Sequence, residues 1–167
     1  LVALTFWLSR FAQPTERRVG EQTRDPDLII ENFSARKLST TGDVQYALNA
    51  ARMAHFPHDD SSRLEKVTLI ATDARQPGMT IKAPVGQLIR KPDGSDEVIM
   101  KGGVLLETVA TDKYPAMKLT TPKLTAYPGT YTARSNDGVV LESNAGTLTA
   151  KSFFLSTQTR RAVFDMV

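Results

Sequence analysis

Residues 117–128 read MKLTTPKLTAYP and match an earlier stretch, YALNAARMAHFP at residues 46–57. A leucine, a basic residue, a second apolar residue, an aromatic ring and a proline recur at the same offsets. The alanine-rich first copy alone is compatible with a helix. The second copy contains Pro122 among β-branched threonines, and proline disrupts a helix interior whereas threonine favours a strand. The pair therefore predicts two strands, which we expect to be neighbouring rungs of one bent sheet.

The spacing inside these copies predicts that the strands bend. Leu119 and Leu124 are five positions apart, and the first copy has the same spacing. A regular strand would place such residues on opposite faces. Either a bulge resets the register or both faces are used. Pro122 lies in this stretch, and Pro84 lies at the same place in a looser third copy, so we predict irregular, bent strands there.

Strand-like runs and turn signals alternate along the rest of the chain. The Pro-Asp-Gly sequence at 92–94 is a typical turn, because proline presets φ and glycine accepts a positive φ. In the run 147–155, alternation places Leu148, Ala150, Ser152 and Phe154 on one face. No helical pattern separates the runs, so an all-β fold is expected and parallel βαβ units are not. We expect about eleven strands, at 29–38, 44–56, 65–72, 79–90, 97–100, 104–111, 117–127, 131–134, 139–143, 147–155 and 161–167.

The composition excludes several classes of site. The 167 residues include 21 basic and 18 acidic side chains, giving a net charge of +3, and the charges are scattered. Nucleic acid binding is therefore not expected. The chain has no cysteine, which excludes disulfides, thiolate metal sites and cysteine nucleophiles.

The first eleven residues, LVALTFWLSRF, are apolar as far as Ser9. A membrane-spanning helix needs about 20 apolar residues, so this piece alone is too short. It is the end of a membrane anchor with Trp7 near the interface, a remnant of a signal peptide, or an amphipathic start. We favour the anchor. Residues 12–26 are polar and are expected to be a linker, and residues 27–167 are expected to be one domain.

The sequence HFPHDD at 55–60 is the cluster that most resembles a metal site. Histidine and carboxylate side chains can bind zinc, but proline and two aspartates also make an ordinary solvated turn. We adopt the turn and expect no metal. Neither a G-x-S-x-G elbow nor a phosphate-binding glycine loop is present, so we expect no cofactor and no enzymatic activity.

The apolar residues are mostly aliphatic or methionine. A filled core is the ordinary explanation, but an incompletely closed β-sheet can also leave an apolar trough between its layers. The sequence pattern alone does not separate core from trough. The residues concerned are Leu48, Met53, Leu69, Ile81, Leu88, Met100, Leu106, Leu119, Leu124 and Leu148.

Taken in order, five segments resemble the LptC family, the bitopic inner-membrane component of lipopolysaccharide export. They are DPDLIIENF at 25–33, YALNAARMAHFPHDD at 46–60, APVGQL at 83–88, VIMKGGV at 98–104 and LTTPKL at 119–124. Each pattern is degenerate, whereas their order and spacing are more specific. The resemblance spans residues 1–167, and the apolar start favours LptC over the related periplasmic bridge protein LptA.

This resemblance implies a twisted antiparallel β-jellyroll with an open hydrophobic groove, preceded by part of an N-terminal membrane helix. It implies single-pass anchoring in the inner membrane, with the main domain in the periplasm. The groove would hold lipopolysaccharide acyl chains and relay them toward the outer membrane. Phe33 and Leu64 fall where the family places groove-lining side chains. The full candidate set is Phe33, Leu48, Met53, Leu64, Ile81, Leu88, Met100, Leu119, Leu124, Leu148 and Phe154.

The implied partners bind edge to edge. The N-terminal edge would meet the jellyroll of the inner-membrane ABC transporter complex, and the C-terminal edge would meet LptA. A homodimer through edge strands is also possible. Arg160 and Arg161, near the C-terminal edge, either meet lipid phosphates or are merely solvated, and we favour the latter. Two alternatives remain: a structural adaptor without a lipid site, and a jelly-roll hydrolase, whose catalytic groups are not apparent.

Overall fold

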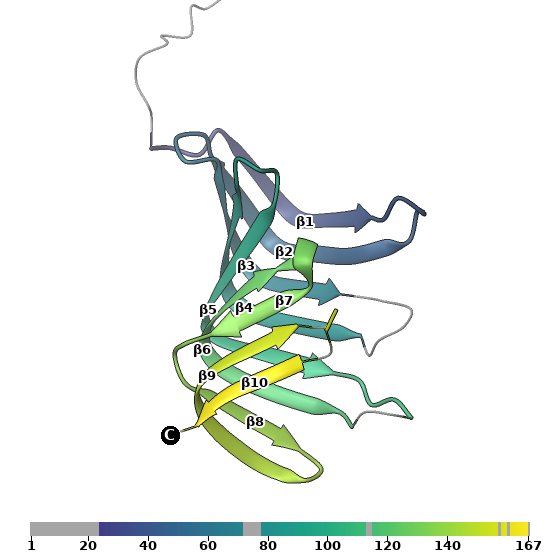
Figure 1. Cartoon of the computed structure of the whole chain (residues 1–167). Coiled ribbons are helices and arrows are strands. Elements are labelled where there is room, and N and C mark those ends of the chain that lie inside the picture. The colour runs from purple at the N-terminus through teal and green to yellow at the C-terminus, as the bar shows by residue number, and fades with distance from the viewer. Residues whose placement is uncertain (1–23, 72–77, 113–114, 157, 160, 167) are drawn as a thin grey trace, which may run out of the picture.

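The computed structural model describes residues 24–71, 78–112, 115–156, 158–159 and 161–166. These residues form ten strands, paired antiparallel throughout, and one short 3-10 helix (Figure 1). The predicted all-β antiparallel class is confirmed. The strands are β1 (Leu28–Leu38), β2 (Val44–Phe56), β3 (Ser61–Ala71), β4 (Met79–Arg90), β5 (Asp96–Thr108), β6 (Met117–Tyr127), β7 (Thr132–Ser135), β8 (Val139–Ser143), β9 (Gly146–Ser156) and β10 (Arg161–Met166), and the helix η1 is Pro128–Thr130.

The strand order leaves two edges of the sheet without a partner strand among the described residues. Strands β1 to β6 pair in sequence order, β7 and β8 both pair with β6 and β9, and β10 pairs with β9. Among the described strands, β1 pairs only with β2, and β10 only with β9. The expectation that the two matched copies are neighbours is wrong. They form β2 and β6, which are separated by β3, β4 and β5, because each strand pairs with the next one along the chain.

The expected strands at 97–100 and 104–111 are one strand, β5, which ends at Thr108, so residues 109–111 lie beyond it. Gly102 and Gly103 have φ values of 90° and 94° and form a bulge rather than a turn. The register of β5 against β6 shifts between Lys101 and Val104. Glycine adopts this backbone conformation without steric cost, so the strand continues beyond the irregularity.

A line of irregular residues crosses strands β1 to β6 and bends each of them. Along each strand every second side chain points inward, except at this line, where two or more successive residues point outward. In β6, for example, the inward residues Thr121 and Leu124 are separated by two exposed residues. Pro84 and Pro122 lie on the line, and Asn32 and Lys66 have positive φ values of 53° and 51° there. The predicted irregularity at both prolines is confirmed. Because of this corner, residues five positions apart can both face inward.

The corner divides the strands into two layers whose buried side chains form one hydrophobic cluster. Figure 1 shows the strands changing direction along this line. Layer A comprises residues 33–38, 44–50, 67–71, 79–83, 104–108, 117–121, 139–143 and 146–150. Layer B comprises residues 28–31, 52–56, 61–65, 85–90, 96–101, 123–127, 132–135, 153–156 and 161–164.

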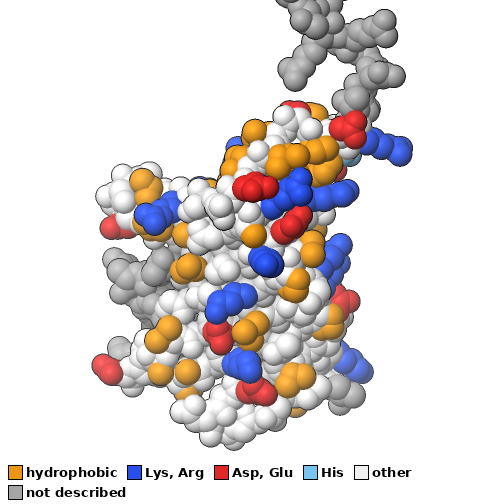
Figure 2. Space-filling view, turned by 180° about the vertical axis from the view of Figure 1, so that it is seen from behind, with side chains coloured by type: hydrophobic (Ala, Val, Ile, Leu, Met, Phe, Trp, Pro, Cys, Tyr) orange, Lys and Arg blue, Asp and Glu red, His pale blue; other side chains and the backbone are white. Residues whose placement is uncertain are grey.

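The outer surface carries mixed charge. Figure 2 shows basic, acidic and hydrophobic side chains interspersed over one face of the molecule. Several basic side chains are paired with acidic neighbours, such as Lys82 with Glu107 at 3.4 Å and Lys118 with Glu142 at 3.3 Å. Both pairs are about half exposed, so each contributes little to stability.

Candidate functional site

The inner face of layer A carries a continuous row of aliphatic side chains, here called ladder A. Each member is the cross-strand partner of the next, from β2 through to β9. Cross-strand neighbours of this kind pack directly against one another. Ladder A consists of Leu48, Leu69, Ile81, Leu106, Leu119, Leu141 and Leu148.

Layer B carries a corresponding row, called ladder B, formed by Ile30, Met53, Leu64, Gly86, Met100 and Leu124. Gly86 interrupts the row of side chains for a steric reason. A Cβ atom at this position would lie 2.9 Å from Cγ1 of Val67, so the backbone of β4 and the side chain of Val67 are in close contact. The interior is tightly packed around this point.

Most of the candidate lipid-binding residues are brought together on these two ladders. Ladder A contains Leu48, Ile81, Leu119 and Leu148, and ladder B contains Met53, Leu64, Met100 and Leu124. Phe33 and Leu88 are partly buried and pack against the same cluster. The central members are closely enclosed, with Leu64, Ile81, Met100 and Leu124 each 0% exposed.

Phe154 lies apart from the ladders and is 42% exposed. The predicted alternation of Leu148, Ala150, Ser152 and Phe154 is wrong beyond Ala150, because inward positions in β9 skip from Ala150 to Phe153. A register shift between β10 and β9 accompanies this skip. Phe153 is 4% exposed, and its ring centroid lies 5.1 Å from that of Phe164 in β10.

Several inward residues were not singled out from the sequence. Ile30, Leu141 and Phe153 join the cluster, and Phe164 packs against it from the edge strand β10. Leu141 lies in the predicted strand 139–143, but its inward orientation follows only from the pairing of that strand with β6 and β9. For Phe153, no local signal distinguished it from the adjacent Phe154.

A buried polar contact joins the two layers. The hydroxyl of Tyr46 donates to Oδ2 of Asp96 at 2.9 Å, and Nε of Arg90 donates to Oδ1 at 3.2 Å. Burial, followed by the hydrogen bond to Asp96, raises the pKa of Tyr46 above its ordinary value. Tyr46 therefore remains a hydrogen-bond donor throughout the physiological pH range.

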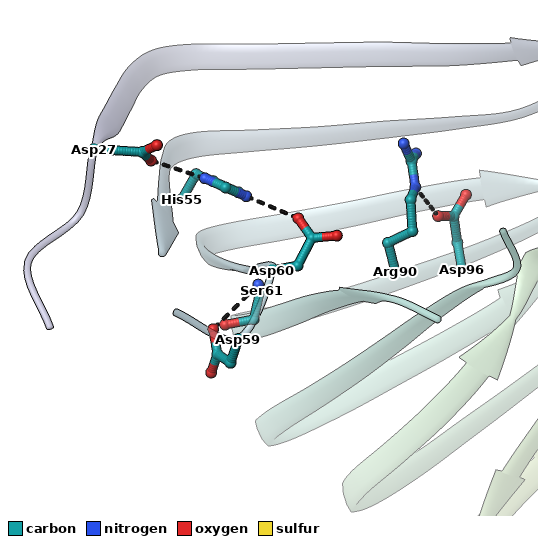
Figure 3. A network of polar contacts seen from close by, with 7 residues as sticks. All are labelled: Asp27, His55, Asp59, Asp60, Ser61, Arg90 and Asp96. Carbon is teal, nitrogen blue, oxygen red and sulfur yellow. Dashed lines mark hydrogen bonds and ion pairs between the residues drawn. The ribbon is translucent and has the colours of Figure 1, made fainter. Parts of the chain in front are cut away.

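The predicted turn is formed by residues 57–60, and a second polar network beside it joins His55, near the end of β2, to Asp27, just before β1 (Figure 3). Nδ1 of His55 lies 2.8 Å from Oδ1 of Asp27, and Nε2 lies 3.2 Å from Oδ1 of Asp60. The backbone N–H of Asp27 also donates to the carbonyl of His55 at 3.1 Å. The hydrogen bonds to Asp27 and then Asp60 raise the pKa of His55. Within the described residues, no group of three or more His, Cys, Asp or Glu side chains could hold a metal ion.

The His55 network predicts a pH-dependent stability. Because the folded-state pKa of His55 is raised, its stabilisation is full below its unfolded pKa of about 6.5 and is lost as pH rises through the folded value. Urea unfolding of the unmodified chain should therefore show a larger free energy at pH 6 than at pH 8.5. His55→Ala should lose part of this difference, whereas His58→Ala should retain it. An equal pH dependence in His55→Ala and the unmodified chain would contradict this assignment.

The sequence matches the family model described as lipopolysaccharide-assembly, LptC-related, over residues 1–165. The chain belongs to the LptC family. The resemblance found in the sequence is confirmed, and membership supports a role in lipopolysaccharide transport. No curated protein matches the chain.

A solved structure supports the fold of this LptC-family domain. It is the crystal structure of LptH, the LptA homologous periplasmic component of the lipopolysaccharide transport device from Pseudomonas aeruginosa. The TM-score is 0.50 at 10% sequence identity, with 88% of this chain and 87% of LptH covered. At this identity the likeness concerns the fold, which is the jellyroll type expected for the family.

Three expectations for the LptC-family chain concern the anchor, the linker and the two arginines near the C-terminal edge. The anchor expected at residues 1–11, most of the linker expected at 12–26, and Arg160 lie outside the described residues. Arg161 begins the edge strand β10 and is exposed. The described part of the chain contains no helix with the length and hydropathy of a membrane span.

Proposed function

We propose that this LptC-family domain binds lipopolysaccharide between layers A and B and relays its acyl chains from the inner membrane toward the outer membrane. The proposal includes a single-pass anchor in the inner membrane and a periplasmic jellyroll. It includes no catalytic step, metal or cofactor. The energy for transport would come from a partner, because the sequence contains no nucleotide-binding motif.

The observation that carries this proposal is the pair of facing aliphatic ladders in a sheet with two unpaired edges. Ladder A extends from β2 to β9 and ladder B from β1 to β6. Burial of an acyl chain contributes about 0.8 kcal/mol per CH₂ group. An interior lined by Leu, Ile and Met side chains would therefore favour such chains once the layers separate to admit them.

The unpaired edges support binding partners on both sides of the domain. An unpaired strand presents free N–H and C=O groups that can pair with another strand. Leu28 and Ile29 of β1 are 49% and 48% exposed, and Val163 and Met166 of β10 are 42% and 58% exposed. We propose that β1 meets the jellyroll of the inner-membrane ABC transporter complex and that β10 meets LptA. The same edge strands could pair between two copies of this chain and form a homodimer.

A structural adaptor without a lipid site is the second candidate. The observation in its favour is the complete burial of Leu64, Ile81, Met100 and Leu124, each 0% exposed. In that case the interior is an ordinary core, and only the edges have a binding function. The two candidates differ in whether lipopolysaccharide ever contacts inward side chains.

Photo-crosslinking in cells separates these candidates. A photoreactive residue in place of Phe33, which is partly buried, should capture lipopolysaccharide, and so should one in place of Leu64. The matched controls are the adjacent exposed residues Ser34 and Arg63. Lipid adducts from the inward positions at five or more times the control yield would support the relay. Adducts with proteins alone would support the adaptor, and lipid adducts from the outward controls alone would overturn the proposal.

A further inference from the structure

The Tyr46–Asp96 hydrogen bond connects two residues that are 50 positions apart and belong to opposite layers. Tyr46 is in the layer A part of β2, and Asp96 is the first residue of β5, in layer B. Both residues are 8% exposed. A buried carboxylate is costly unless it is paired and hydrogen-bonded, so the bonds from Tyr46 and Arg90 stabilise the closed arrangement.

The contact lies at the side of the interior remote from the corner. Tyr46 is close to the beginning of β2, and Asp96 begins β5, so both are at the strand ends farthest from the bend. The next inward residues toward the corner are Leu48 of ladder A, 2% exposed, and Val98, 0% exposed. Near the corner, by contrast, Oγ1 of Thr121 lies 2.7 Å from Oγ of Ser135, and the continuous strands already hold the layers together.

We propose that the strand ends around Tyr46 and Asp96 are where an acyl chain passes between the layers, and that their hydrogen bond is a clasp that opens first. This inference rests on the proposed function and specifies its route. The strand backbones cross from one layer to the other at the corner, which keeps that side closed. At the clasp, the layers are joined by side chains, which can separate without breaking a strand.

Arg90 makes the clasp sensitive to the charge on the head group of the lipid whose acyl chain enters. Its side chain is 65% exposed, whereas the side chain of Asp96 is 8% exposed. Nε of Arg90 donates to Oδ1 of Asp96, the contact drawn in Figure 3. An arriving phosphate group would compete with Asp96 for the guanidinium, because both are oxyanions that pair well with arginine. Loss of that bond would leave Asp96 with fewer partners and favour its hydration and opening of the clasp. An amphiphile with an anionic head group should therefore be taken up faster than a neutral one.

Tyr46→Phe tests the clasp, because it removes one hydroxyl and retains the ring. In stopped-flow fluorescence with the full chain, this variant should take up pyrene-labelled phosphatidic acid about fivefold faster or more than the unmodified chain, since the hydrogen bond to a charged group is lost. Tyr127→Phe is the matched control. The hydroxyl of Tyr127 donates to Oε1 of Glu97 at 3.2 Å within layer B, and its removal should leave the rate unchanged.

Arg90→Gln is a second test that leaves the buried hydroxyl in place. The unmodified chain should take up labelled phosphatidic acid faster than labelled diacylglycerol with the same chains, and Arg90→Gln should lose this preference. Arg134→Gln, which removes an exposed arginine from layer B, should keep it. Unchanged rates in Tyr46→Phe, with thermal unfolding showing a folded protein, would overturn the clasp, as would an unchanged preference in Arg90→Gln.

The proposed function can stand if the clasp fails. Lipopolysaccharide adducts at Phe33 together with unchanged uptake rates in both variants would reject the clasp and leave the lipid relay supported. Absence of lipid adducts at every inward position would reject both.

Discussion

Leu124→Asp is expected to prevent the domain from folding. Leu124 is 0% exposed and pairs with Met100 on ladder B. The substitution loses about 2–5 kcal/mol of packing, and burial of an unpaired carboxylate adds several kcal/mol more. This sum is comparable to the whole stability of a typical domain, about 5–15 kcal/mol. Circular dichroism and urea unfolding should show an unfolded chain or a large loss of stability.

Phe154→Asp is the matched control for this substitution. Phe154 is 42% exposed and lies on the outward side of β9, so its replacement should change the free energy of unfolding by only about 1 kcal/mol. A Leu124→Asp protein with native-like stability would show that this part of the interior is hydrated. That result would favour a permanently open trough over two layers that separate to admit lipid.

Proline at one of two adjacent positions in β10 is expected to weaken the binding of a partner at the C-terminal edge. Backbone N–H groups along a strand point alternately to its two sides. Ala162 and Val163 are adjacent, so the N–H of one residue points toward β9 and the N–H of the other points toward the free edge. Proline removes the N–H group. One of Ala162→Pro and Val163→Pro should therefore weaken LptA binding tenfold or more with little loss of stability. The other should mainly destabilise the β9–β10 pairing.

Binding of purified LptA, measured by isothermal titration calorimetry, checks this expectation. Ile29→Pro in β1 is the control, because it alters the opposite edge of the sheet and should leave LptA affinity unchanged. If both β10 variants bind LptA as tightly as the unmodified chain, β10 is not the edge that this partner uses.

The sequence predicted strands well where turn chemistry is local. The bounds of β2, β4, β6 and β8 agree with the predicted ranges, because Pro, Gly, Asn and Asp mark the adjoining turns. Turn-forming residues gave a wrong prediction at Gly102 and Gly103, where a strand end was expected and a bulge within β5 is found. A positive φ serves equally in a turn and in a bulge, and only the pairing of β5 with β4 and β6 distinguishes them.

The candidate site was predicted in part. The aliphatic character of Leu48, Leu119 and Leu124 was apparent, and their five-residue spacing indicated the bend. Their arrangement into two ladders was not predictable, because it depends on the register of every intervening strand. A skip of one position in β9 was enough to exchange Phe154 for Phe153 on the inward face.

The all-β class, most of the strands, the bend at the prolines and the resemblance to the LptC family are readable from the order of the amino acids. These features depend on the preferences of single residues and on patterns within a few positions. The strand neighbours, the two edges that lack a partner among the described strands, and the contact of Tyr46 with Asp96 across the interior depend on the folded arrangement. Register and layer packing are set jointly by contacts between residues distant in sequence, and no local preference encodes such contacts.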